Sequence, residues 1–257
     1  MRAALIAPEA MPGSLCLVPG CGRQTMAAEG KGYAEHHCRY HVQHKARHGS
    51  HWHATYLPRD YRPYVEAAAR WVGDSREEHY VALTLANLES LMRNGGAAIP
   101  AHRLNGLTSK EKARVAFSRL REAGVTPERL CAIHLGVNAL IEDDRGSHRV
   151  REFRIVQVAK AYHRLASGTH SEWKKHYEGR NPLGLKFDYY PKSSGLVLRE
   201  IGGAAETACE FISDRAIPLV VAMKLALSGP HASHLPGWRP LWRRKLDEAN
   251  AKTRLGG

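Results

Sequence analysis

Residues 108–144 read TSKEKARVAFSRLREAGVTPERLCAIHLGVNALIEDD and carry the clearest local structural signals of the chain. Thr108 and Glu111 have the spacing of a capping box, in which each side chain bonds the other residue's backbone N–H, so a helix is predicted to begin there. Gly124 ends that helix, and Thr126-Pro127 begins the next one. Apolar residues of the second helix recur at helical spacing: Leu130, Ile133, Val137 and Leu140. The region therefore predicts two consecutive helices.

This helix pair has the length of a helix-turn-helix, but an αα-hairpin within a helical bundle is the preferred interpretation. A DNA-reading helix must present suitable side chains to base edges. The outward side of the second helix offers a poor set for that purpose: Glu128, Arg129, His134 and Asn138. Sequence-specific reading of the major groove by this helix is therefore not expected.

Helical periodicity continues on both sides of this region, so the fold is predicted to be mainly α. The residues between Pro58 and Pro63 are interpreted as a linker, and the alternating residues 185–190 as a short strand. The further predicted helices cover residues 64–72, 80–92, 148–166, 196–213 and 217–227.

Composition limits the classes of protein to consider. The chain has 257 residues, 43% of them hydrophobic, which is enough for a core in one large or two small domains. Its 38 Lys and Arg against 25 Asp and Glu give a net charge of +13. This excess favours an anionic partner, with nucleic acid first and a membrane surface second. No apolar run reaches the roughly 18 residues of a membrane-spanning helix.

The cysteine content and the first residues favour an intracellular, cytoplasmic location. Five cysteines are too few for a disulfide scaffold in a chain of this length. The apolar stretch from Ala3 to Ala7 is shorter than the core of a secretory signal. Thiols are expected to stay reduced, and clustered Cys and His then indicate a metal site. Cys131 and Cys209 lie singly in apolar helical patterns and are expected to be buried.

The other three cysteines form the sharpest chemical signal. They follow the pattern Cys16-x4-Cys21, then sixteen residues, then Cys38-x2-His41. Zinc prefers four sulfur or nitrogen ligands in a tetrahedron, which two ligand pairs joined by a loop can supply. His41 is the preferred fourth ligand because Cys-x2-His has the geometry of Cys-x2-Cys. The neighbouring histidines remain alternatives: His36, His37 and His44.

The segment from Cys16 to Gly49 resembles the short zinc knuckles of phage and mobile-element proteins, including many HNH-type endonucleases. The matching elements are Gly20-Cys21, Gly32-Tyr33, Cys38-x2-His41 and Arg47-His48-Gly49. Residues 34–37 are an insertion relative to that pattern. The resemblance covers about an eighth of the chain and implies a small DNA-associated zinc unit, but not nuclease activity. We therefore expect a zinc knuckle with a His-rich basic extension in residues 1–57. An α-helical, bundle-like domain would follow in residues 58–257, with a sub-boundary near 168–195 left open.

A nuclease of this type needs a general-base histidine and a cation-holding His or Asn on a following helix. Glu35-His36-His37 is the only candidate for the first part, and the nearest Asn, Asn87, lies inside an apolar helix. Catalysis is not favoured, and no catalytic residue is assigned.

Three basic segments are candidates for binding nucleic acid. Basic residues near aromatic ones suit a phosphate backbone and its bases. The candidate residues are Arg39, Lys45 and Arg47 beside the knuckle, Arg149, Phe153, Lys160 and Arg164 on one helix face, and Arg243 and Arg244 near the C-terminus. The alternatives are a solvated polar face, a second metal site among His44, His48, His51 and His53, and a Phe153 that packs in the core while the arginines extend to solvent.

The leading hypothesis is a zinc-containing, non-catalytic nucleic-acid-binding protein of a phage or mobile element, acting as a subunit of a nucleoprotein complex. DNA is favoured over RNA. The two rival hypotheses are a metal-dependent HNH-like nuclease using His36 or His37, and a zinc-stabilised module that binds an acidic protein.

Overall fold

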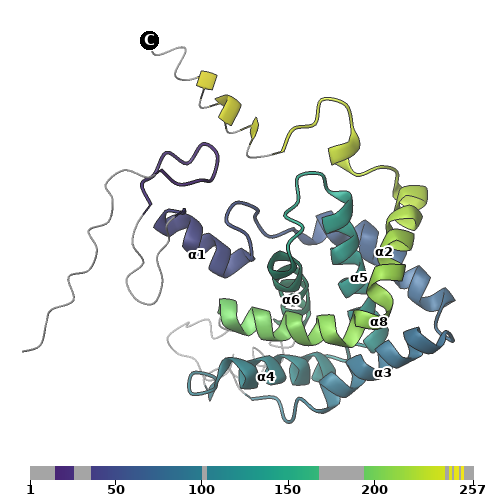
Figure 1. The fold of residues 1–257 in the computed structure, drawn as a ribbon. Coiled ribbons are helices and arrows are strands. Elements are labelled where there is room, and N and C mark those ends of the chain that lie inside the picture. Colours follow the sequence, from purple (N-terminus) through teal and green to yellow (C-terminus); the bar gives the residue numbers. More distant parts are fainter. Residues whose placement is uncertain are drawn as a thin grey trace, which may run out of the picture.

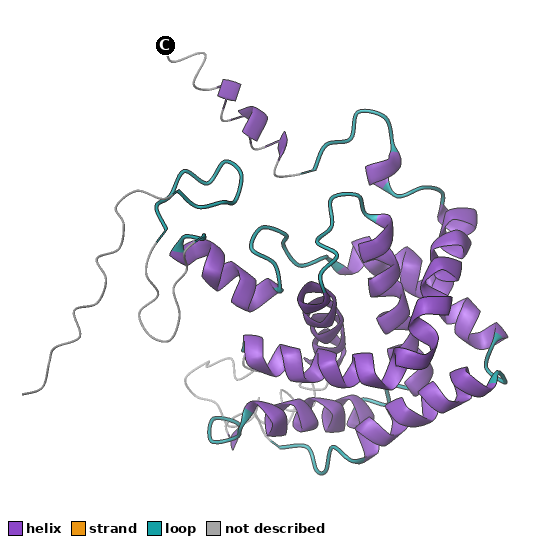
Figure 2. Ribbon diagram, viewed as in Figure 1, coloured by secondary structure: helices purple, strands orange, loops and turns teal. Residues whose placement is uncertain are grey.

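The computed structural model describes residues 15–25, 36–99, 103–167, 194–240, 243–244, 246–248 and 250–251. These residues are mainly helical, as predicted, and pair as β-structure only at one isolated bridge between Leu15 and Gln24 (Figure 2). The helices are α1 (Arg39–His48), α2 (Pro58–Asp74), α3 (His79–Arg93), α4 (Ser109–Glu122), α5 (Pro127–Asp143), α6 (Arg151–Ser167) and α8 (Gly195–Ser228), followed by the short 3-10 helix η3 (Ala232–His234). None of the described helices has the length and apolar character needed to cross a membrane.

The predicted helix starts are confirmed at α4 and α5. The Glu111 carboxylate accepts a hydrogen bond from the Thr108 N–H at 2.7 Å, and the Thr108 hydroxyl accepts one from the Glu111 N–H at 3.3 Å. At α5 the Thr126 hydroxyl accepts a hydrogen bond from the Arg129 N–H at 3.3 Å, and Pro127 stands in the first turn. These local signals fix the starts because they satisfy N–H groups that no helical carbonyl can reach.

Helix α5 is the centre of the fold (Figure 1). Every residue from Leu130 to Ile141 is buried. The helix packs against α2, α6 and α8, whereas α4 packs against α3, α6 and α8. The interpretation of α4 and α5 as an αα-hairpin is therefore wrong, because each of the two helices packs mainly against other helices and not against its neighbour in the sequence. Burial of His134 and Asn138 also removes them from any contact with base edges.

Two predicted boundaries differ from the structure. Helix α2 begins at Pro58, so residues 58–63 are helical and not a linker; Pro is well suited to the first turn, where its missing N–H costs nothing. Helix α8 is one helix of 34 residues that continues through Pro218. Ala216 and Val220 are fully buried on either side of that proline, and their packing offsets part of a cost of about 3 kcal/mol. The strand predicted at 185–190 lies outside the described residues.

Helix α1 docks on the helical body through backbone and ion-pair contacts. Gly49 ends α1 with φ of 76°, and a Cβ at this position would lie 2.6 Å from the carbonyl oxygen of Glu152. The Glu152 carboxylate pairs with Lys45 of α1 at 3.2 Å and with Arg199 of α8. Gln157 donates a hydrogen bond to the His48 carbonyl at 3.0 Å. The division into two domains at residue 57 stays a prediction.

The segment after α8 returns across the turn between α5 and α6. His234 pairs with Asp143 at 2.8 Å, and the hydroxyl of buried Ser233 accepts a hydrogen bond from the Arg145 N–H at 3.1 Å. Further along, the Cα of Leu246 lies 4.0 Å from the position that a Cβ on Gly20 would occupy. The C-terminal segment therefore reaches the turn between Cys16 and Cys21.

Candidate metal centre

Three cysteine sulfurs and one imidazole nitrogen converge near the N-terminus. The Cys16 Sγ lies 3.2 Å from the His41 Nδ1, and the Cys38 Sγ lies 3.5 Å from the same nitrogen. The Cys21 and Cys38 sulfurs are 3.7 Å apart, and all four ligand atoms lie within 4.8 Å of one another. Tetrahedral zinc, with Zn–S bonds of about 2.3 Å, places its sulfurs roughly 3.8 Å apart. The four residues therefore lie close enough to hold one metal ion.

Local backbone structure brings the four ligands together. The Cys16 N–H donates to the Arg23 carbonyl at 2.8 Å, which closes a hairpin over residues 15–24, and the Cys21 N–H donates to the Val18 carbonyl at 3.0 Å inside it. Cys38 is the residue just before α1, and His41 lies in the first turn of that helix. The Leu17 N–H donates to the His36 carbonyl at 2.9 Å and holds the hairpin beside α1.

The electrostatics of the cluster favour thiolate formation at the start of α1. Burial by itself raises the pKa of the Cys38 thiol. Hydrogen bonds from the His41 backbone N–H, from the Cys21 and Cys16 thiols and from the Tyr40 backbone N–H together outweigh burial, so that the net pKa lies below its ordinary value. The pKa of Cys21 is raised, mainly by burial. Metal ligation requires the thiolate, so the helix start lowers the cost of deprotonating Cys38.

The alternative ligands and the second metal site are not assembled. The His37 ring stacks on His51 at a centroid distance of 3.5 Å, and the His44 Nδ1 lies 2.8 Å from the Ser50 carbonyl oxygen. Within the described ranges, no second group of Cys, His, Asp or Glu side chains converges as closely. Burial lowers the pKa of both His48 and His51 to about 4, so these two rings are neutral at pH 7. Cys131 and Cys209 are fully buried, as expected.

No family model, curated protein or solved structure matches the chain. The resemblance to zinc knuckles therefore depends on the motif residues alone.

The residues predicted to form a basic face on α6 are mostly buried or bonded to other residues of the chain. Phe153 has no exposed surface, and the centroid of its ring lies 4.9 Å from that of His53. It therefore packs in the core, which was the alternative interpretation, and is not available to stack on a base. Lys160 is half-buried and donates to the Thr55 hydroxyl at 2.5 Å; burial lowers its pKa to about 8. Arg164 donates to the Tyr56 carbonyl at 3.2 Å. Arg149 is exposed, but it donates to the Glu142 carbonyl at 2.7 Å.

The candidate residues beside the knuckle and near the C-terminus differ in whether their side chains are exposed and free of ion pairs. Arg39 and Arg47 are exposed, and neither forms an ion pair with a described residue, whereas Lys45 is engaged by Glu152. Arg243 and Arg244 are also exposed, with Arg243 3.6 Å from Asp247. Of these candidates, the structure thus leaves Arg39, Arg47 and Arg244 exposed and outside the ion pairs of the described residues.

Sequence reasoning missed three exposed side chains on the knuckle itself. Leu15 and Leu17 are 59% and 66% exposed, and Arg23 holds its guanidinium carbon 4.9 Å from the ring centroid of Tyr40. The position of the two leucines on either side of Cys16 could have indicated their exposure. When one residue of an extended segment points at a metal, its two neighbours point away from it.

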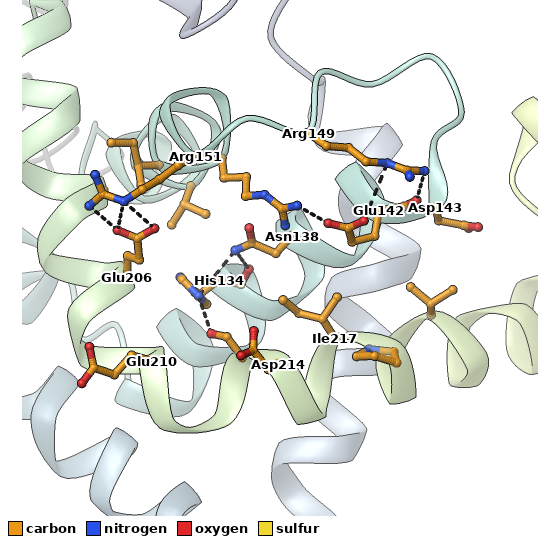
Figure 3. A pocket seen from close by; sticks show the side chains of 17 residues that line it. His134, Asn138, Glu142, Asp143, Arg149, Arg151, Glu206, Glu210, Asp214 and Ile217 are labelled. Carbon is orange, nitrogen blue, oxygen red and sulfur yellow. Dashed lines mark hydrogen bonds and ion pairs between the residues drawn. The ribbon is translucent and has the colours of Figure 1, made fainter.

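A cleft of about 930 Å³ lies between α5, α6 and α8. In Figure 3, Glu206, Glu210 and Asp214 extend from α8, while His134 and Asn138 extend from α5. Its arginines are paired with carboxylates: Arg151 with Glu206, and both Arg149 and Arg154 with Glu142. These ion pairs explain why Arg149 is not a free cation on this side of α6.

His134, a buried residue that lines this cleft, should make folding stability depend on pH. Burial lowers its pKa to about 4, and no described partner bonds its Nδ1. In the unfolded chain the pKa of His134 is about 6.5, which is higher than in the folded protein. The stabilisation that comes from keeping this ring neutral is therefore complete above pH 6.5 and declines as the pH falls towards 4. When the pH is lowered from 7 to 5, the free energy of unfolding, measured with urea, should fall by about 2 kcal/mol more in the wild type than in His134→Gln. The exposed His79→Gln should behave like the wild type; equal losses in all three proteins would contradict the prediction.

Proposed function

We propose that the chain is a zinc-containing nucleic-acid-binding protein in which the metal is structural. Cys16, Cys21, Cys38 and His41 would hold the ion, and all four ligand positions of a tetrahedron would be filled by protein. A closed zinc site of this kind supplies folding energy to a segment with little core of its own. The observation that carries the proposal is that the two elements supplying the ligands, the hairpin and α1, also carry exposed cations and an exposed aromatic ring: Arg23, Arg39, Tyr40 and Arg47.

The net charge of +13 supports an anionic partner. The knuckle resemblance supports DNA over RNA, a phage or mobile-element setting, and a place in a larger nucleoprotein complex inside the cell. The proposal assigns no catalytic role to His36 or His37.

Salt dependence of binding to random-sequence duplex DNA tests the proposal. Phosphate contacts release counterions, so the zinc-loaded protein should bind with an affinity that falls steeply with salt. Arg39→Ala/Arg47→Ala should reduce the slope of log affinity against log salt by about two, because two phosphate contacts are lost. Arg70→Ala/Arg93→Ala, which removes two exposed arginines of α2 and α3, is the matched control.

Other outcomes would redirect the assignment. Absence of salt-sensitive binding to any nucleic acid would favour the hypothesis of a protein-binding module. Cleavage of DNA with Mg²⁺ or Mn²⁺ that is lost in His36→Ala/His37→Ala, with zinc content unchanged, would favour the nuclease.

A further inference from the structure

The cleft between α5, α6 and α8 is acidic, although the chain as a whole carries a net charge of +13. Five carboxylates and three arginines are among the described residues that line it. The arginines are paired with Glu142 and Glu206, and Asp143 is paired with His234. The other two carboxylates, Glu210 and Asp214, form no ion pair or hydrogen bond with a described residue, and Figure 3 accordingly draws no dashed line to them.

These two unpaired carboxylates lie one turn apart on α8. Glu210 and Asp214 are both exposed. Negative side chains at this i, i+4 spacing repel each other and destabilise a helix. No cation among the described residues offsets that repulsion, so a cation bound in the cleft would remove it.

The most deeply buried polar group of the cleft is a hydrogen-bond acceptor. His134 has its Nε2 3.1 Å from the hydroxyl of Ser213 on α8. That hydroxyl donates its hydrogen to the Cys209 carbonyl at 2.8 Å, so the Nε2 must be the nitrogen that carries the proton. The Nδ1 of His134 therefore has a lone pair, and no described group donates a hydrogen bond to it.

Asn138, one turn after His134, supplies a second acceptor. It is 5% exposed and lines the cleft, and Figure 3 shows its side chain extending from α5 next to that of His134. Its Nδ2 lies 3.4 Å from the His134 Nε2 but donates to the His134 carbonyl at 2.8 Å, which leaves the Oδ1 as the other end of the amide. No described residue donates to that oxygen. The polar groups left unpaired in this part of the chain call for a cationic ligand rich in N–H donors.

The walls of the cleft add apolar surface. Ile155 and Val158 line it from α6, and Ile217 and Val221 line it from α8. Its volume of about 930 Å³ lies in the range of small-molecule sites, roughly 300–1,000 Å³, which combine apolar walls with a few polar groups. A bare metal ion does not fit, because the described side chains of the cleft do not converge into a set of three ligands.

We propose that this cleft binds a small aliphatic amine of the polyamine class. Its ammonium groups pair with Glu210 and Asp214 and donate a hydrogen bond to the Asn138 Oδ1, while its methylene chain packs on the apolar walls. An amine with several ammonium groups joined by methylenes matches both parts of the cleft. The inference goes beyond the proposed function, because none of these residues belongs to the metal centre or to the cations beside it.

Isothermal titration calorimetry of the full chain with spermidine, at low salt and without nucleic acid, tests the inference. The comparison probe is a trilysine peptide with blocked ends, which carries the same charge as spermidine. The peptide should bind more weakly, because its amide groups would lose their hydration against the apolar walls. Equal affinity for the two probes would reduce the interaction to charge attraction and overturn the inference.

A variant that removes both free carboxylates locates the site. Glu210→Gln/Asp214→Asn should weaken spermidine binding about 5- to 30-fold, which corresponds to the loss of two partly exposed ion pairs. The matched control is Asp74→Asn/Glu77→Gln, which removes two exposed carboxylates near the end of α2 and changes the net charge equally. The control should bind as the wild type does. Melting temperatures should match in all three proteins, because every changed side chain is exposed.

Nuclear magnetic resonance provides a second measurement that needs no variant. Spermidine should shift the side-chain amide signal of Asn138 and leave that of the exposed Asn94 in place. Absence of spermidine binding, equal affinity in the carboxylate variant and the wild type, or an unchanged Asn138 signal at saturation would each overturn the inference. None of these outcomes bears on binding of nucleic acid beside the metal centre.

Discussion

Replacing Cys38 with alanine should reduce zinc from one ion per chain to near zero and unfold the hairpin over residues 15–24. Cys38 supplies one of four ligands and lies where α1 begins, so its loss breaks the link between hairpin and helix. The hairpin has almost no other core: its buried apolar cluster consists of Cys16, Val18 and Cys38, with Cys21 packed against them. Structural zinc contributes on the order of 10–16 kcal/mol of binding free energy, which no other contact in this segment can replace.

Metal analysis of the purified protein and amide hydrogen exchange over the hairpin provide the measurements. Cys131→Ala is the matched control, since Cys131 is buried in α5 away from the cluster and should leave the zinc content at one per chain. Full zinc occupancy in the Cys38→Ala protein, or absence of zinc from the wild type, would refute the metal assignment.

Phe153→Ala should destabilise the fold by about 3–5 kcal/mol, which is the usual cost of removing a fully buried phenyl ring. The ring packs between His53 and Tyr56, with centroid distances of 4.9 and 6.0 Å, and therefore joins α6 to the chain that follows α1. Nucleic-acid affinity per folded molecule should not change. Urea unfolding and anisotropy on the same samples measure the two effects.

Phe211→Ala removes the same side chain from a 53% exposed position on α8 and should cost much less stability. If Phe153→Ala instead lowered affinity while stability remained that of the wild type, the buried position of the ring would be contradicted.

Local chemistry made part of the structure predictable. The helix starts at Thr108 and Thr126 depend on side chains within three residues, and the ligand set depends on spacings that a hairpin and one helical turn can close. The preference for His41 over His36, His37 and His44 followed from the geometry of Cys-x2-His, and the structure brings His41 into the cluster.

The predictions that the structure contradicts are those that contacts between distant segments decide. Helical periodicity placed Phe153, Lys160 and Arg164 on one side of α6 but could not say that residues 48–56 would cover that side. Lys160 bonds Thr55, and Arg164 bonds the Tyr56 carbonyl, each across more than 100 residues of sequence. The pairing of α4 and α5 failed for a related reason, because adjacency in sequence does not determine which buried faces match.

The crossing of α6 and α8 has a consequence for how the sequence can vary. A Cβ on Gly202 would overlap the carbonyl oxygen of Ile155, and Gly49 meets the backbone of the same helix one turn earlier. At both positions main chain lies against main chain, so no neighbouring side chain can be trimmed to make room. Saturation mutagenesis should therefore find these two glycines almost irreplaceable although neither takes part in any chemistry, and second-site suppressors of their loss should be rare.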